Sequence, residues 1–286
     1  MNNPYLIKQR KEKSKIVLTQ ILLLVFITVL WELASDVGLI NSFLFSKPSE
    51  IFKLFIVYLK DGSIFKHIGI SVLETMLGLI IGTLIGLIFA IIIWWFPFLQ
   101  KVLDPYLVVL NALPKTALAP ILIIWAGTGI KGITVVAMSI SLVLTIISAY
   151  SYFIMMNEEK IKMIKSFGAN KLQILSKLII PSNLPNIISI IKINIGMSWV
   201  GVIVGEFLVS RAGLGYLIVY GSQVFRMDLV MMGVIILAII AYLMYMFVNM
   251  IEIKFKKKRG IKWKKLLSYC FYHYYLLVLV GVKEIN

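Results

Sequence analysis

The sequence ITVVAMSISLVLTIISAYSYFIM, which runs from Ile133 to Met155, contains no charged residue. A helix needs about 20 largely apolar residues to cross the hydrocarbon core of a bilayer. This stretch is long enough, and it therefore predicts a membrane-spanning helix. The sequence around it repeats the pattern, so the fold class follows from the number of such stretches.

Four more stretches meet the same criterion and carry at most two charged residues each. They are Ile16–Ala34, Ile68–Phe96, Ser182–Val209 and Leu229–Ile251. A sixth candidate, Val102–Ala126, is less regular because charged residues and prolines interrupt it. We therefore expect an all-α membrane protein with six spanning helices.

The composition excludes several other classes. Hydrophobic residues make up 60% of the chain and charged residues only 15%, whereas about a quarter of a soluble domain is charged. The single Cys270 excludes an internal disulfide, and His67 and His273 lie too far apart for a metal-ligand motif. The net charge of +16 does not indicate nucleic acid, because the basic residues flank the apolar stretches.

The distribution of Lys and Arg predicts the orientation. With a cytoplasmic N-terminus, 19 of these residues fall on the inside and 7 on the outside, as the positive-inside rule requires. Residues 1–15 then form a basic cytoplasmic segment, and 16–34 an uncleaved first helix rather than a signal peptide. Five further spans would lie within 67–253, followed by a basic tail, 254–286.

Two shorter apolar segments are expected at the membrane surface. In the outer loop 46–66, Ser46 is a candidate N-cap and Pro48 starts a helix that is too short to span. In the tail, Leu266–Val282 is marginal for a seventh span. We expect an interfacial helix there, and the alternative is a sequence scar.

One segment resembles a nucleotide site but lacks its context. Gly127–Gly132 matches the spacing GxGxxG, yet it joins two predicted spans, and no acid follows within residues 133–157. Ile133 stands where a P-loop needs lysine. We also find no nucleophile–base set and no metal site. The chain is therefore expected to bind no cofactor, and not to be an enzyme.

Glycines recur at four-residue spacing in two predicted spans. They are Gly78, Gly82 and Gly86 in one span, and Gly201 and Gly205 in another. Small residues at this spacing let membrane helices approach closely. The alternative is a chance distribution in a glycine-rich membrane chain.

The segment from Asn157 to Pro181, NEEKIKMIKSFGANKLQILSKLIIP, has apolar residues at helical spacing. Gly168 interrupts it, and Asn170 is suited to cap a second helix. We therefore expect two short amphipathic helices that end at Pro181. They are suited either to lie on anionic lipid headgroups or to dock a soluble partner.

The spacing from Gly168-Ala169 to Pro181 resembles the EAA loop of ATP-binding-cassette importer permeases. Three more motifs agree in order: Leu113–Pro120, Trp199–Glu206 and Gly213–Ile218. Together they are similar to the nitrate/sulfonate/taurine branch of the type I importers. The similarity covers residues 67–253.

The resemblance implies a six-helix permease with a cytoplasmic coupling helix pair, which docks in a separate ATPase. That subunit uses ATP and Mg²⁺, a second permease copy completes a homodimer, and an extracytoplasmic binding protein delivers solute. The coupling residues would be Glu158, Glu159, Lys162, Lys165, Phe167, Gly168, Ala169, Lys171 and Pro181. Lys162 departs from the pattern, because it occupies the position of the family's glutamate.

Some polar residues lie within the predicted spans. Lys115, between Pro114 and Pro120, is expected either to line the pathway or to hold a kink. Lys192 and Glu206 are candidates for pathway or gating roles, although internal ion pairs are the more expected interpretation.

The rival class is a secondary carrier that acts without an ATPase, but the expected inverted repeat is not evident. The sequence does not identify the solute. Small anions such as sulfonates and heterocyclic vitamin precursors both fit this branch.

Overall fold

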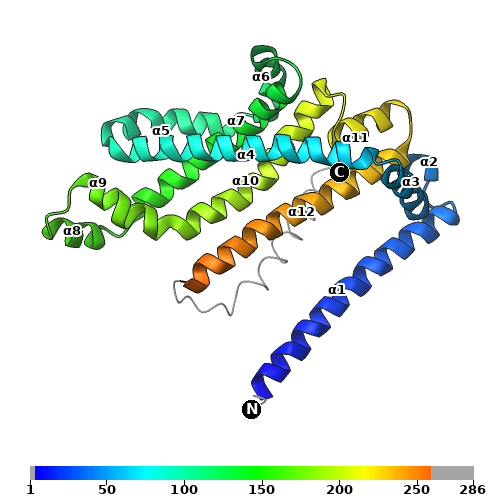
Figure 1. Cartoon of the computed structure of the whole chain (residues 1–286), viewed down its shortest axis with the longest axis horizontal. Coiled ribbons are helices and arrows are strands. Elements are labelled where there is room, and N and C mark those ends of the chain that lie inside the picture. Colours follow the sequence, from blue (N-terminus) through cyan, green and yellow to red (C-terminus); the bar gives the residue numbers. More distant parts are fainter. Residues whose placement is uncertain (1–3, 259–286) are drawn as a thin grey trace.

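The computed structural model describes residues 4–258, and within that range every regular element is a helix or a helical turn (Figure 1). In chain order these elements are α1 (Pro4–Asp36), α2 (Ser42–Phe45), α3 (Pro48–Lys60), α4 (Ser63–Trp95), α5 (Pro97–Ala112), the 3₁₀ turn η1 (Lys115–Leu118), α6 (Ala119–Ala126), α7 (Ile130–Ile154), α8 (Glu158–Ser166), α9 (Lys171–Ile174), the π-helical turn η2 (Leu175–Ile179), α10 (Ile180–Val209), α11 (Leu214–Gln223) and α12 (Met227–Lys258). The predicted all-α membrane fold is confirmed. The interfacial helix predicted for residues 266–282 lies outside the described part of the chain.

Five segments of the described chain are long and apolar enough to cross a membrane. They are Ser14–Asp36, Ser63–Trp95, Ile130–Ile154, Lys171–Val209 and Met227–Ile253. The sixth predicted span differs from the expectation of one helix. It consists of Pro97–Ala112 and Lys115–Ala126, which are bent by 87° at a short break.

Helix α7 packs against α4 along a row of glycines. A Cβ atom added to Gly78 would lie 2.5 Å from the Ala137 Cβ, and one added to Gly82 would lie 2.0 Å from the Ser141 Oγ. At Gly86 it would meet Thr145. Only glycine permits backbones this close, and in lipid such contact supplies the packing energy.

Helix α10 packs on α7 in the same way but in the opposite direction. An added Cβ at Gly201 would lie 2.6 Å from the Ala137 Cα, and one at Gly205 would lie 3.1 Å from the Ile133 Cα. Along this contact the residue numbers rise on α10 while those of their partners on α7 fall, so these two helices are antiparallel. Along the contact between α4 and α7 the residue numbers of both helices rise together, so that pair is parallel.

Because α4 and α7 are parallel, the segment that connects them, residues 97–126, must cross back over the length of the bundle. The chain leaves α4 at Trp95, beyond the level of Gly86, and enters α7 at Ile130, well before the level of Thr145. At about 1.5 Å per residue the connection must return roughly 36 Å along the helix axes. Helices α5 and α6 with η1 therefore act together as the sixth crossing.

Prolines explain why this crossing is bent. Pro114 has no N–H group, and it follows directly after Leu113, where α5 is capped in extended conformation. Pro120 lies in the first turn of α6, where the missing N–H group costs no helical hydrogen bond. The chain therefore stops one helix and starts another, instead of continuing through 102–126.

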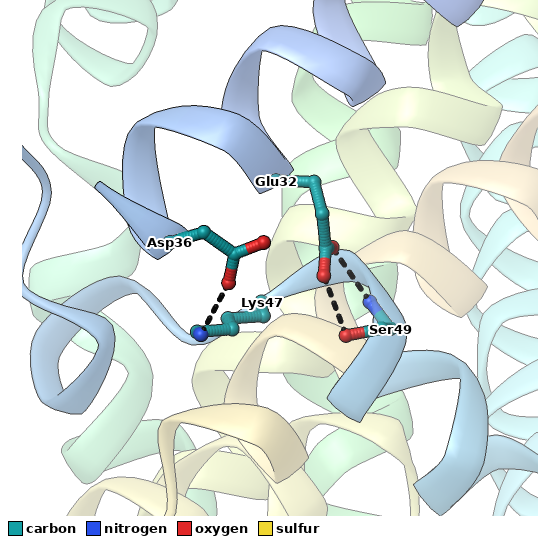
Figure 2. A network of polar contacts seen from close by, with 4 residues as sticks. All are labelled: Glu32, Asp36, Lys47 and Ser49. Atoms are coloured by element: carbon teal, nitrogen blue, oxygen red, sulfur yellow. Dashed lines mark hydrogen bonds and ion pairs between the residues drawn. The ribbon is translucent and has the colours of Figure 1, made fainter. Parts of the chain in front are cut away.

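Helix α1 lies apart from the other helices and is held at its end (Figure 1). Figure 2 shows Glu32 accepting hydrogen bonds from the Ser49 N–H (3.0 Å) and Ser49 Oγ (2.7 Å), and Asp36 paired with Lys47 (2.6 Å). Glu32 thus caps the start of α3. The hydrogen bond to Asp36 raises the pKa of Lys47.

Two local predictions about helix ends need correction. Lys47, not Ser46, is the N-cap of α3, and its side chain makes no capping bond because Glu32 fills that place. Pro181 does not end a short helix. Instead, Lys171–Val209 runs on through it, because the wider π-helical turn η2 precedes the proline ring.

Replacing Gly82 by alanine tests the α4–α7 contact. The new methyl group would also lie 2.7 Å from the Met138 carbonyl oxygen, so overpacking is expected to destabilise the protein by about 1–3 kcal/mol. Thermal unfolding of the purified protein in detergent measures the effect. Gly69→Ala is the matched control, because nothing lies within 4 Å of its added Cβ. Equal melting temperatures for the two variants would contradict this packing.

Candidate functional site

The coupling segment, residues 157–181, is built as two helical pieces joined by a tight turn. The Asn157 side chain accepts the Glu159 N–H (2.7 Å) and caps α8. At the end of α8, Gly168 adopts a φ of 79°, and the N–H groups of Gly168 and Ala169 bond the carbonyls of Lys165 and Ile164. This is a Schellman motif, and its left-handed position favours glycine.

The second piece starts with the predicted cap. The Asn170 side chain accepts the Gln173 N–H (2.8 Å), and the Gln173 side chain accepts the Asn170 N–H (2.9 Å). This capping box confirms the expectation for Asn170. The polypeptide then continues through α9 and η2 into α10, so the coupling segment and a membrane span form one continuous helix.

One side of the coupling segment is packed on the helix bundle. Ile174, Leu175, Leu178 and Ile179 are buried in the same cluster as Phe153, and residues of α8 pack at its edge. This burial fixes the segment to the carboxyl-terminal ends of α4 and α7.

Lys171 strengthens that attachment. Its ammonium group donates to the Trp95 carbonyl and lies 5.3 Å and 5.8 Å from the ring centroids of Trp95 and Trp94. A cation at the carboxyl end of α4 is favoured by the helix dipole and by the aromatic rings. The predicted coupling residue Lys171 therefore points toward the bundle.

The opposite side of the coupling segment is open and partly apolar. Phe167 is 83% exposed, Leu172 62% and Met163 55%. Glu158, Glu159 and Lys165 are also exposed, and Lys162 pairs with Glu158 at 3.5 Å. An exposed pair of this kind contributes little to stability, so Lys162 remains free to exchange partners.

A hollow of about 700 Å³ lies between the coupling segment and the junction of α4 with α5. Its walls include Trp94, Pro97, Ile161, Lys165 and Lys171. A concave, mixed polar and apolar surface flanked by exposed hydrophobic side chains is typical of a site that receives a partner.

A second polar site lies at the other end of α10, where four successive N–H groups at the start of α11 meet side chains of other helices. Gly213 N–H donates to His67 Nδ1 (3.0 Å), and Leu214 N–H to Ser71 Oγ (2.8 Å). The Glu206 carboxylate accepts from Gly215 (2.5 Å) and Tyr216 (3.3 Å). We call this set the α11 clamp.

Glu206 is buried within the α11 clamp, 1% exposed. It also accepts a hydrogen bond from Ser71 Oγ (2.5 Å). Glu74, one helical turn further along α4, is equally buried and lies beside the Glu206 carboxyl. Glu74 therefore has a partner, which was not evident from the sequence. The gating role of Glu206 stays a prediction.

Lys192 makes the kind of internal pair that the sequence favours. Its ammonium group is hydrogen-bonded to Glu252 of α12, and both side chains are largely buried, with 10% and 1% exposed. The Tyr245 ring lies 5.6 Å away. In the membrane interior an ion pair of this kind neutralises both charges.

Sequence reasoning missed a buried amide at the meeting point of three helices. Asn194 of α10 donates to Thr83 Oγ1 of α4 (3.0 Å) and to Thr145 Oγ1 of α7 (2.6 Å). No motif marks it. Asn194 reaches the two threonines only because the glycine contacts align α4, α7 and α10 at this level.

The broken crossing contains the remaining predicted residues. Lys115 Nζ donates to the Asn111 carbonyl at 3.1 Å, which satisfies one of the acceptors left open where α5 ends. This contact supports the interpretation that Lys115 holds the kink. Pro114 and Pro120 flank it, as described above, and a pathway role for the three residues stays a prediction.

The fold and these sites define a multi-pass membrane transport subunit, and comparison with known proteins gives the family. Residues 82–257 match the family described as "Binding-protein-dependent transport system inner membrane component". The chain belongs to that family. The predicted resemblance to ATP-binding-cassette importer permeases is confirmed, and a secondary carrier does not agree with it.

Two relatives illustrate the branch. The chain is 28% identical over 241 residues to the putative aliphatic sulfonates transport permease protein of Bacillus subtilis strain 168, covering 84% of this chain and 87% of that protein. It is 25% identical over 227 residues to the taurine transport system permease protein of Escherichia coli K12, covering 78% and 82%.

A solved structure shows the same fold. A chain of a bacterial ABC transporter involved in the import of the acidic polysaccharide alginate superposes with a TM-score of 0.60 at 12% identity, covering 87% of this chain and 98% of that chain. The family match and the relatives identify this chain as a multi-pass inner-membrane permease of the ATP-driven, binding-protein-dependent importer type.

The Lys192–Glu252 pair can be tested by a double-mutant cycle. Lys192→Met leaves a buried carboxylate without its cation and is expected to destabilise the protein by about 3–5 kcal/mol. Lys192→Met combined with Glu252→Met should recover most of that loss, because both charges are gone. Unfolding in mixed micelles measures each variant. Purely additive effects would show that the two side chains do not interact.

Proposed function

We propose that the coupling segment is the docking site for a separate cytoplasmic ATP-binding subunit, which hydrolyses ATP with Mg²⁺. The observation that carries the proposal is that the two faces of the segment differ in burial. One face is buried on the bundle, and the other exposes Phe167, Met163 and Leu172 beside a hollow. An exposed apolar patch of this kind is typical of a surface that receives a partner protein.

The continuity of the helix from Lys171 to Val209 supports a transport mechanism. Its 39 residues reach about 58 Å at about 1.5 Å per residue, so a movement at the coupling segment passes directly into a membrane span. ATP binding on the partner then shifts the bundle between inward-facing and outward-facing states. The coupling is a free energy shared between the two sites.

We propose further that two copies of the chain form the pathway. The face formed by the broken crossing is largely uncovered in one chain, with Trp125 79% exposed and Ile124 78% exposed. Apolar groups beside the prolines and Lys115 suit a helix pair that faces a second copy and a shared pathway. An extracytoplasmic binding protein delivers the solute from outside.

The proposed orientation places both termini in the cytoplasm. It rests on the excess of 19 Lys and Arg on one side over 7 on the other. Six crossings, including the broken one, return the chain to its starting side. The coupling segment then lies inside, where ATP is available.

The solute is proposed to be a small sulfonate. The support is that the two relatives described above are named for the transport of aliphatic sulfonates and of taurine. A heterocyclic vitamin precursor is the alternative. Binding of candidate solutes to the cognate binding protein distinguishes them.

Purification from the native membrane tests the proposed function. We expect an ATP-binding subunit to co-purify with the chain, and reconstituted vesicles to take up solute only when ATP and the binding protein are both supplied. Uptake by this chain alone would contradict the proposal and would favour a secondary carrier.

Phe167→Asp tests the docking site. A charge on the exposed apolar face should lower the amount of co-purifying ATP-binding subunit at least tenfold, since a single hot-spot side chain is worth about 2 kcal/mol or more. Phe52→Asp is the matched control, because Phe52 is a similarly exposed phenylalanine on α3. Equal recovery of the subunit with both variants would contradict the proposed site.

Lys115→Ala tests the pathway. If Lys115 attracts an anionic solute, uptake should fall about tenfold or more while the complex stays assembled. The reason is that a charge in a partly dehydrated passage contributes more than one in water. Lys131→Ala, at an exposed lysine beside the same crossing, is the control. Normal uptake by Lys115→Ala would restrict Lys115 to holding the kink.

A further inference from the structure

The α11 clamp satisfies every N–H group at the start of α11 by a side chain that belongs to another helix. A helix normally leaves its first N–H groups to water or to its own cap. Here His67 and Ser71 come from α4 and Glu206 from α10. The start of α11 is therefore held in place by side chains of both α4 and α10.

The fit around the Glu206 carboxylate is too close for side chains on its neighbours. A Cβ atom on Gly213 would lie 2.3 Å from Glu206 Oε1, and one on Gly215 would lie 2.8 Å from Oε2. Gly213 also has a φ of 125°, which few other residues adopt. The backbone of α11 is thus shaped to receive this one carboxylate.

The other face of α11 is packed on α12. A Cβ on Gly221 would lie 3.0 Å from Val230, and one on Gly233 would lie 2.8 Å from Ile218. Helix α11 therefore lies between the outer end of α10 and the start of α12. In Figure 1 it stands at the opposite end of the bundle from α8 and α9.

We propose that Glu206 is a positioning residue that carries movement of the coupling segment to the outer face of the permease. The path is the continuous helix Lys171–Val209, which begins in the coupling segment and ends beside Glu206. Glu206 then holds α11 through the hydrogen bonds that its carboxyl group accepts from the N–H groups of Gly215 and Tyr216. This inference rests on the proposed docking of an ATP-binding subunit.

The chemistry of the clamp makes Glu206→Gln the sharpest variant. Glutamine has the same size, but it can accept at only one of its two terminal atoms. It cannot accept from Ser71 at one atom and from Gly215 and Tyr216 at the other. The variant therefore removes one of the two acceptor atoms at the centre of the clamp without opening a cavity.

The test uses the complete importer with the ATP-binding subunit and the solute-loaded binding protein. Spin labels are placed through Tyr220→Cys on the exposed face of α11 in both permease copies, with Cys270→Ser to remove the native thiol. We expect ATP to change the distance between the two labels. Glu206→Gln should reduce that change by at least half, and it should bring the ratio of stimulated to basal ATPase activity close to one.

Glu50→Gln, at an exposed glutamate on α3, is the control and should leave both readouts as in the parent. A Glu206→Gln importer that is less stable but keeps the distance change and the ratio would overturn the inference, because Glu206 would then only support the fold. If the variant does not assemble, Ser71→Ala removes two bonds of the clamp. It should lower both readouts in the same direction, and unchanged readouts would overturn the inference.

The two proposals fail differently. If ATP changes no distance in the parent importer, the proposed docking of the ATP-binding subunit is wrong before any variant is compared. If the parent responds and Glu206→Gln responds equally, only the role of Glu206 is wrong.

Discussion

Close backbone contact among α4, α7 and α10 is the constraint on which the remaining structure depends. Glycines on α4 and α10 bring both helices against Ala137 of α7, one parallel and one antiparallel. This arrangement brings Asn194 to Thr83 and Thr145, and it obliges the broken segment to return across the membrane. It also sets the coupling segment at one end of α10 and the α11 clamp at the other.

The sequence alone was sufficient for the helical class, for the five regular spans and for the amphipathic coupling segment. Those features depend on local composition and periodicity, which a single sequence contains. The capping of α9 by Asn170 was predictable for the same reason. The four family motifs, from Leu113 to Ile218, were sufficient for the transporter class.

The features that could not be predicted depend on residues far apart in the chain. Glu206 meets Ser71 across 135 positions and Lys192 meets Glu252 across 60, and neither pair has a sequence spacing that marks it. Glu32 displaces Ser46 as the cap of α3 only because α1 ends beside it. The helix continues through Pro181 because a π-helical turn precedes it, and no simple propensity predicts such a turn.

The central claim is that the exposed face of the coupling segment receives an ATP-binding subunit. A photoreactive amino acid placed at Met163 in the native membrane tests it most directly, with the same probe at Phe52 on α3 for comparison. We expect a cross-linked product at Met163 that contains the ATP-binding subunit, and none at Phe52. A product with that subunit at Phe52, and only lipid adducts at Met163, would contradict it.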